Sequence, residues 1–139
     1  METLHAAEGP GGHAVVVAGD RIGAVGTYEE LRERFPGARV RTWRGTLGPA
    51  LVHEGPLPDA PSPRERVHAV LKRGAVAVLE RHAAEPGVRE AASRVGVLVL
   101  PAVRRPELTV GHRADLAVFD ADGRCVATVC AGRLVHRRA

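Results

Sequence analysis

Four polar side chains that could bind a metal ion or transfer protons follow two apolar segments in the middle of the chain. His53 and Glu54 come directly after the first apolar segment, and Glu80 and His82 follow the second. Two imidazoles and two carboxylates can hold a divalent ion or act as general acid and base. Residues of these types are also common in solvated loops at strand ends, so the sequence leaves both interpretations open.

The elements that would position these side chains form a strand–helix–strand–helix–strand pattern. Ser62 and Glu65 make a capping box that predicts the start of the first helix. The continuous apolar run 75–79 is typical of a strand buried on both faces. Crossovers of this kind leave the strands parallel, and the carboxyl ends of parallel strands lie at one edge of the sheet. The expected elements are strand 50–52, a helix that Gly74 ends, strand 75–79, a helix that opens at 85–87 and ends at Gly96, and strand 97–100.

Both ends of the chain are predicted to form β-hairpins. Gly19 and Asp20 supply a tight turn between two short apolar strands, and Thr27 begins a capping box for a short helix. Residues 1–12 are expected to be a Gly-rich lead-in with little apolar surface to bury. Because a two-stranded hairpin is marginal alone, the hairpins of the two ends should share one sheet system. The strands are expected at 14–18, 21–25, 38–43, 114–119, 124–130 and 133–136, and residues 45–49 are expected to lead into strand 50–52.

These two ends resemble the composite β-domain of the amidohydrolases, and those of imidazolonepropionase and aminodeoxyfutalosine deaminase most of all. The motifs that carry the resemblance are residues 15–26, 108–120 and 129–135. In that family the two ends pair into one small β-sandwich beside a metal-dependent barrel. The resemblance implies a mixed α and β fold. A composite β-sandwich of residues 1–48 and 107–139 would flank residues 49–106, a short parallel β-α-β-α-β remnant of a TIM-like barrel.

The first strand of that remnant departs from the family where metal binding would begin. Residues 49–57 stand where relatives have Pro-Gly-Leu/Phe-Val-Asp-x-His-x-His, and the two histidines of that motif are metal ligands in the family. Gly55 and Leu57 occupy their places, and His53 falls on the preceding acid. Catalytic zinc needs about three protein ligands besides an open position for water. The family's hydrolytic mechanism is therefore not expected to run in this chain.

Two functional hypotheses follow. The leading one is a non-catalytic binding, scaffold or regulatory subunit without a cofactor. The alternative is a metal-dependent hydrolase of non-peptide carbon–nitrogen bonds, acting on a cyclic amide, an amidine or an aminopurine. Its site would use His53, Glu54, Glu80 and His82 or be completed by a partner chain, with zinc on His53 and His82. A link to menaquinone metabolism rests on analogy with the futalosine deaminase alone.

Composition argues against a nucleic-acid partner. The 139 residues include 20 Lys and Arg against 16 Asp and Glu, a net charge of +4, and Lys72 is the only lysine. Heavy use of Arg, Ala, Gly and Pro is what a GC-rich genome would produce. A nucleic-acid surface needs clustered basic residues and stacking aromatics. Here the paired arginines are isolated, and aromatic residues make up only 3% of the chain.

An incomplete barrel would leave strand edges and an apolar face uncovered, so a homodimer or a partner protein is expected. No apolar run approaches the ~20 residues that span a bilayer, and the first residues do not resemble a signal sequence. We therefore expect a cytoplasmic protein with no membrane partner.

The other candidate residues are interpreted as structural. Ser62 is a helix cap, and Cys125 and Cys130 are core residues. His68 lies on a helix surface, His112 and His136 are far in sequence from the cluster, and Gly19 to Gly26 form a hairpin rather than a phosphate loop.

Overall fold

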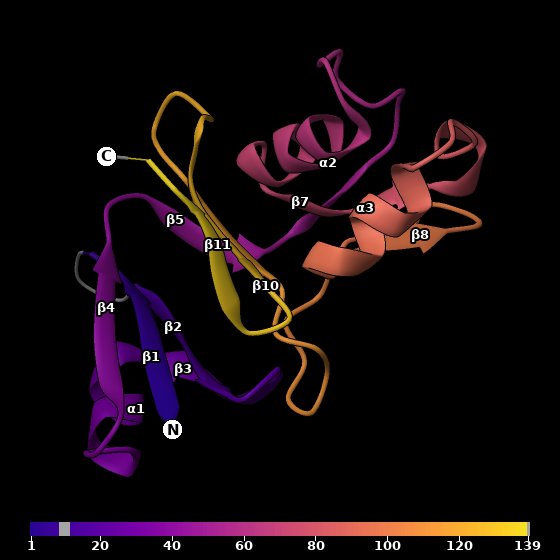
Figure 1. Ribbon diagram of the computed structural model, residues 1–139. Helices are drawn as coiled ribbons and strands as arrows, with labels where there is room; N and C mark the ends of the chain where they lie inside the picture. The colour runs from indigo at the N-terminus through magenta and orange to yellow at the C-terminus, as the bar shows by residue number, and fades with distance from the viewer. Residues whose placement is uncertain (9–11, 139) are drawn as a thin grey trace.

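The computed structural model describes residues 1–8 and 12–138 and shows three sheets and three α-helices within them (Figure 1). Two four-stranded sheets lie against each other, and a three-stranded parallel sheet with two helices lies beside them. This is the mixed fold that the sequence predicts, with a composite sandwich built from the two ends of the chain and a short parallel strand–helix layer between them. The predicted domain boundaries near residues 49 and 106 stay a prediction.

The first sheet is built from the N-terminal part of the chain. Its order is β3-β2-β1-β4, with β1 antiparallel to β2 and parallel to β4. The turn at Gly19, where φ is +63°, joins β2 to β3 as predicted. The strands are β1 (Glu2–Ala7), β2 (His13–Ala18), β3 (Arg21–Thr27) and β4 (Arg39–Trp43). Helix α1 (Tyr28–Arg34) follows β3, and its first turn is capped by Thr27, whose Oγ1 accepts from the Glu30 amide at 3.2 Å.

The prediction of a Gly-rich lead-in with little apolar surface to bury was wrong for the described part of residues 1–12. Residues 2–7 form β1, which lies in the interior of the first sheet, and Leu4 in it is fully buried. Residues 9–11 lie outside the described part of the chain. The segment was missed because it contains few large apolar residues. Its burial comes from its pairing with β2 on one side and β4 on the other.

The second sheet combines one strand from the first half of the chain with the C-terminal hairpins. Its order is β11-β10-β9-β5, and every neighbouring pair is antiparallel. The strands are β5 (Thr46–Pro49), β9 (Leu116–Phe119), β10 (Cys125–Cys130) and β11 (Arg133–Arg137). Residues 46–49 were expected only to lead into the next strand, but they pair with β9 and so carry the chain between the two sheets. Val15, Val17 and Trp43 pack against Leu116 and Val129 between the two sheets, which makes this a sandwich.

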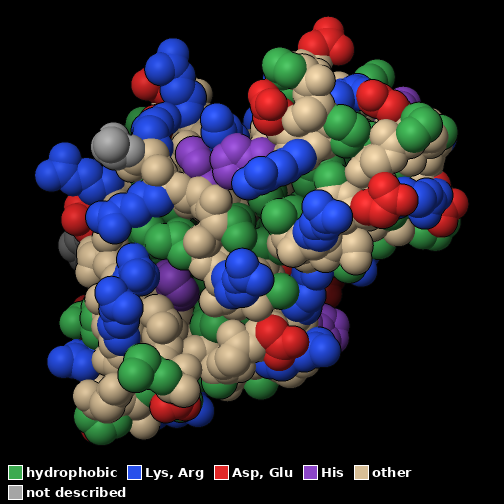
Figure 2. Space-filling view, in the orientation of Figure 1, with side chains coloured by type: hydrophobic (Ala, Val, Ile, Leu, Met, Phe, Trp, Pro, Cys, Tyr) green, Lys and Arg blue, Asp and Glu red, His purple; other side chains and the backbone are tan. Residues whose placement is uncertain are grey.

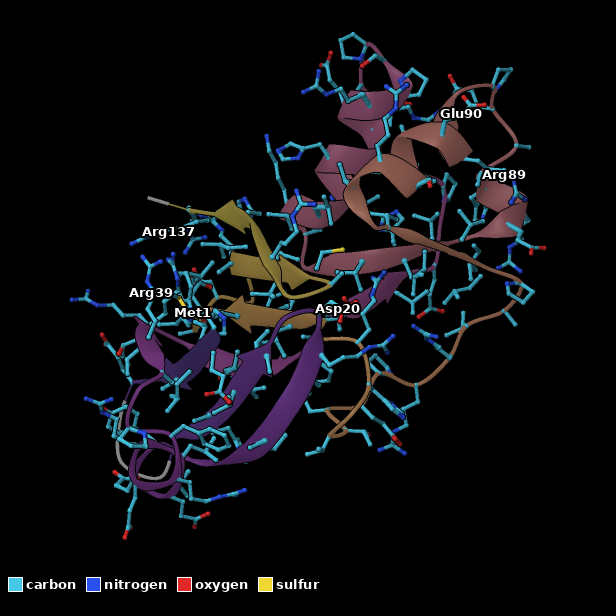
Figure 3. All side chains as sticks on the ribbon, turned by 60° about the horizontal axis from the view of Figure 1, so that its bottom comes forward. Met1, Asp20, Arg39, Arg89, Glu90 and Arg137 are labelled. Atoms are coloured by element: carbon cyan, nitrogen blue, oxygen red, sulfur yellow. The ribbon has the colours of Figure 1, made fainter. Side chains whose placement is uncertain are left out.

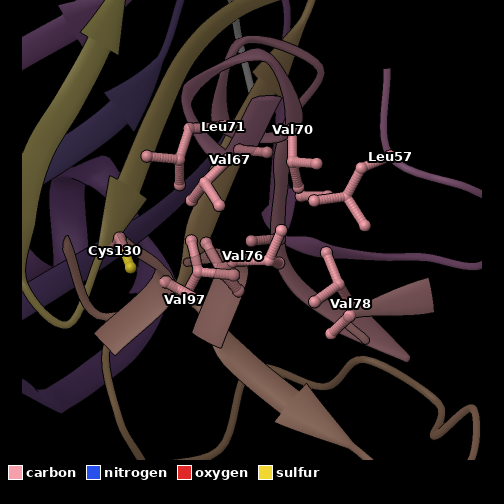
Figure 4. Close-up of a cluster of buried hydrophobic side chains, with 14 residues drawn as sticks. Leu57, Val67, Val70, Leu71, Val76, Val78, Val97 and Cys130 are labelled. Atoms are coloured by element: carbon pink, nitrogen blue, oxygen red, sulfur yellow. The ribbon is translucent and has the colours of Figure 1, made fainter. Parts of the chain in front are cut away.

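The third sheet has the predicted parallel β-α-β-α-β order. Strand β6 (Leu51–His53) pairs with β7 (Ala75–Leu79), which pairs with β8 (Leu98–Leu100). Helix α2 (Pro63–Lys72) begins at Ser62, whose Oγ accepts from the Glu65 amide at 3.2 Å. Helix α3 (Val88–Val95) ends at Gly96, where φ is +84°. All of β7 is buried, and Val76 and Val78 belong to the apolar cluster that includes Val67, Val70 and Leu71 of α2 (Figure 4).

Two polar contacts join the parallel layer to the sandwich. Thr128 of β10, which is fully buried, donates its hydroxyl proton to the carbonyl of Leu71 at the end of α2, at 2.7 Å. Arg113 donates from Nη1 to the carbonyl of Gly96 at 2.7 Å and from Nε to both oxygens of Asp115 at 3.0 and 2.8 Å. Both contacts link C-terminal segments to helix ends, so the two parts are held at defined positions by side-chain hydrogen bonds as well as apolar packing.

Candidate functional site

The four predicted site residues lie after the carboxyl ends of two adjacent strands. His53 is the last residue of β6 and stands opposite Val78 of β7, so the two strand ends lie side by side as predicted. The residues after β7 form a single 3₁₀ turn, η1 (Glu80–His82). Glu54 and Glu80 are exposed, while His53 and His82 are half-buried. The predicted position of the cluster at one edge of the sheet is therefore what the structure has.

The side chains at this edge have local hydrogen-bond partners instead of one another. His53 Nε2 donates to the carbonyl of Pro56 at 2.8 Å. His82 Nε2 accepts from Nε of the adjacent Arg81 at 3.3 Å. Over residues 1–8 and 12–138, no hydrogen bond or ion pair joins any two of the four candidates, and no group of three or more His, Cys, Asp and Glu side chains could hold a metal ion.

Leu57, which the resemblance to the amidohydrolases aligns with a metal-ligand position, is part of the hydrophobic core. Its side chain is 3% exposed and lies with Val70 and Val78 in the cluster beneath α2 (Figure 4). A position that would have to present a ligand to the strand ends is therefore turned toward the helices. Gly55, at the other ligand position, has no side chain to contribute.

Arg66 of α2 positions this loop, and the sequence reasoning missed it. Its Nε donates to the carbonyl of Pro58 at 3.1 Å, its Nη2 donates to the carbonyl of Leu57 at 3.0 Å, and its Nη1 pairs with Glu85. One guanidinium thus ties the loop after β6 to the segment before α3. In the sequence, only two features pointed to this role: Arg66 lies three residues after the helix start at Pro63, and a proline-rich loop precedes that helix.

Both cysteines lie in the core, as predicted, and His136 is partly buried. Cys125 and Cys130 are free thiols buried in the core, and burial raises the pKa of Cys130 to about 11. That thiol is protonated at neutral pH and is therefore a poor nucleophile. His136 on β11 has a lowered pKa, first because it is partly buried and then because His68, Lys72 and Arg138 lie nearby.

The basic side chains are spread over the surface. Lys and Arg side chains cover much of the visible face and are densest toward β4 and the C-terminus (Figure 2). Asp and Glu side chains occur among them on the same face. No helix in the described ranges has both the length and the apolar character that crossing a membrane requires.

Comparison with known proteins agrees with the composite architecture. Residues 14–38 match the sequence model of the imidazolonepropionase-like composite domain of bacteria. No curated protein matches the chain. The solved guanine deaminase of E. coli is similar, with 13% identity, a TM-score of 0.52, and a match over 71% of this chain and 35% of that one. Helicobacter pylori aminofutalosine deaminase matches with 16% identity and a TM-score of 0.44 over 58% of this chain and 28% of that one.

The fold defines the class: a composite β-sandwich, formed by both ends of the chain, beside a parallel strand–helix layer. The match over residues 14–38 to the imidazolonepropionase-like composite domain confirms, for this N-terminal segment, the resemblance expected from the sequence. The chain spans about a third of the length of the solved deaminases it matches. Between the two halves of its sandwich it has three parallel strands, where a full barrel has eight.

Proposed function

We propose that this chain is a non-catalytic amidohydrolase-like protein that acts as a binding, scaffold or regulatory subunit, with no metal cofactor. The observation that carries the proposal is the pair Gly55 and Leu57. The first has no side chain, and the second is buried in the core beneath α2. Activation of water by zinc at neutral pH needs about three protein ligands and an open position.

The surroundings of the strand ends support this reading. Turning Leu57 outward would expose an apolar side chain whose burial is worth about 2 kcal/mol. It would also break the contacts that Arg66 makes with the loop backbone. The Nε2 atom of His53 donates to the Pro56 carbonyl, so only Nδ1 of this side chain has a lone pair in this arrangement.

A second copy of this chain, or another protein, is proposed to cover the parallel layer. Strands β6 and β8 are the edges of the three-stranded sheet, and each has one side unpaired within it. Unpaired strand edges favour association.

Zinc analysis and activity assays on the intact protein test the proposal. The protein is incubated with zinc, dialysed and analysed for bound metal. It is then assayed on cyclic amides, amidines and aminopurines. The expected result is substoichiometric zinc and no turnover. Stoichiometric zinc with turnover in the wild type would refute the proposal.

The second candidate is a hydrolase of non-peptide carbon–nitrogen bonds with a residual or partner-completed site. The pairing of His53 with Val78 favours it, because it brings the ends of β6 and β7 together. In this case zinc would be held by His53 and His82, with Glu54 or Glu80 as the proton-transferring group. The variants His53→Ala and His82→Ala should then abolish activity or metal binding without unfolding the protein. The exposed His68→Ala is the control. If both variants behave as the wild type does, this candidate fails.

A further inference from the structure

A cavity of about 390 Å³ lies at the junction of the parallel layer and the sandwich. Its walls come from the first residues of the three parallel strands, from the connector 104–107 and from residues 112–115. Arg21, at the start of β3, completes it. Figure 3 labels Asp20, the residue before it, well apart from Arg89 and Glu90 of α3. The volume falls in the range of about 300–1,000 Å³ that is typical of small-molecule sites.

The floor of the cavity is apolar, and Leu51 is its exposed residue. It is formed by Ala50, Leu51, Val52, Val76, Ala77 and Leu98. Leu51 is 42% exposed although its partner strand β7 is wholly buried. An exposed leucine in a concave surface offers apolar area to a ligand, since burying it removes that area from water.

The rim of the cavity is cationic. Four arginines line it, against the two carboxylates of Glu107 and Asp115. The carboxylate of Asp115 is already paired, because it accepts hydrogen bonds from Nε of Arg113 and from the amide of Ala131 at 2.9 Å. Arg113 in turn donates to Asp115 and to the carbonyl of Gly96, so these donors are occupied.

The connector supplies the available charge. Both Arg104 and Arg105 are exposed, and across the described ranges neither forms an ion pair with a carboxylate. Arg21 lies 3.6 Å from Asp20, in a pair that is more than half exposed and therefore weak. Guanidinium groups bind carboxylates through two parallel hydrogen bonds and also stack on flat rings.

We infer that this cavity binds a small organic carboxylate with a flat apolar body. The carboxylate lies against Arg104 and Arg105, and the apolar body covers Leu51 and Leu98. The site is at the starts of the strands, whereas the histidine and glutamate candidates follow the strand ends. Binding at this cavity does not depend on the proposed loss of catalysis and would be expected of a catalytic chain as well.

Titration of the intact protein with 1-naphthoate, followed by amide NMR, tests the inference. The neutral 1-naphthamide is the matched ligand control. The expected result is saturable shifts at Leu51, Ala77 and Leu98 with the carboxylate, and binding at least about tenfold weaker with the amide, the loss expected for one charge-assisted contact.

Two charge-matched variants locate the carboxylate. R104Q/R105Q should weaken naphthoate binding about tenfold or more. R32Q/R34Q, which removes the same charge from α1 at the far end of the sandwich, should leave it unchanged (Figure 1). Equal binding of acid and amide, an equal loss in both variants, or no saturable shift at roughly millimolar naphthoate would overturn the inference. Shifts of the same amides with protein concentration alone would show that a second copy fills the cavity, which would also overturn it.

Discussion

Acidification should destabilise this protein through one buried histidine in the sandwich. His5 of β1 is 3% exposed, and its Nδ1 accepts a hydrogen bond from Nε1 of Trp43 at 3.2 Å. Burial first, and then the neighbouring Arg41, lower the pKa of His5 from 6.5 to about 4. The native state therefore requires a neutral imidazole, because a proton on Nδ1 would both break this hydrogen bond and bury a charge.

The sign and size of the effect follow from this shift. The folded-state pKa lies below the unfolded value, so the unfolded chain takes up the proton first as the pH falls. Stability is fully present above about pH 6.5 and is lost progressively down to about pH 4. The fall of the His5 pKa from 6.5 to about 4 corresponds to about 3 kcal/mol of free energy of unfolding. That is a large fraction of the stability of a small domain, which is about 5–15 kcal/mol.

Urea unfolding followed by fluorescence measures this effect directly. Trp43 is the only tryptophan and lies against His5, with ring centroids 6.3 Å apart. The variant His5→Gln keeps a hydrogen-bond acceptor but cannot titrate, so most of the pH dependence between about pH 6.5 and 4 should disappear. His136 has a pKa lowered in the same direction, so the double variant H5Q/H136Q should flatten the profile further.

The exposed His13→Gln, on the same sheet, is the matched control and should follow the wild type. If the wild type and His5→Gln lose the same free energy of unfolding over this range, His5 is not held neutral in the sandwich. The reasoning from its burial would then be refuted.

Three further changes probe the closure of the fold and the loop after β6. Gly132→Ala should lower the free energy of unfolding in urea by at least about 1–3 kcal/mol. The reason is that φ is +81° at this residue and the new Cβ would meet the carbonyl of the β2–β3 turn. The control Gly48→Ala, which has open space around it, should cost much less. Arg66→Ala should speed proteolysis of the loop after β6, because the guanidinium donates to two carbonyls of that loop. The exposed Arg64→Ala on the same helix should not speed it. Equal rates for the two variants would show that the Arg66 guanidinium does not hold the loop. Ser62→Ala should cost about 1 kcal/mol through the lost cap of α2, and an unchanged midpoint would contradict the capping geometry.

Local patterns were enough to predict most elements of the fold. The two capping boxes, the Gly19 turn and the apolar run 75–79 each depend on neighbours within a few residues, and the structure has each of them. The central strand β1 was missed for the opposite reason. Its burial is decided by partners that lie up to 36 residues away, as in the pairing of Thr3 with Arg39.

The candidate site was predicted only in part. The position of His53 beside β7 follows from parallel pairing, which the alternation of strands and helices already indicates. The local partners of His53 and His82 could not be predicted, because they depend on loop and side-chain conformations that no periodic pattern records. The role of Arg66 was missed for the same reason.

The sequence by itself determined the resemblance to the amidohydrolase composite domain and the residue types at the two positions where relatives have metal-binding histidines. Motifs at both ends carry the composite domain, and Gly55 and Leu57 are read directly from the chain. Only the tertiary structure decided that Leu57 is buried beneath α2 and that Leu51 and Arg104, far apart in sequence, line one cavity. The physical reason is the distance along the chain over which each interaction acts. Turn, cap and strand preferences are set by short-range sterics and hydrogen bonds, whereas burial and cavities arise when distant segments pack.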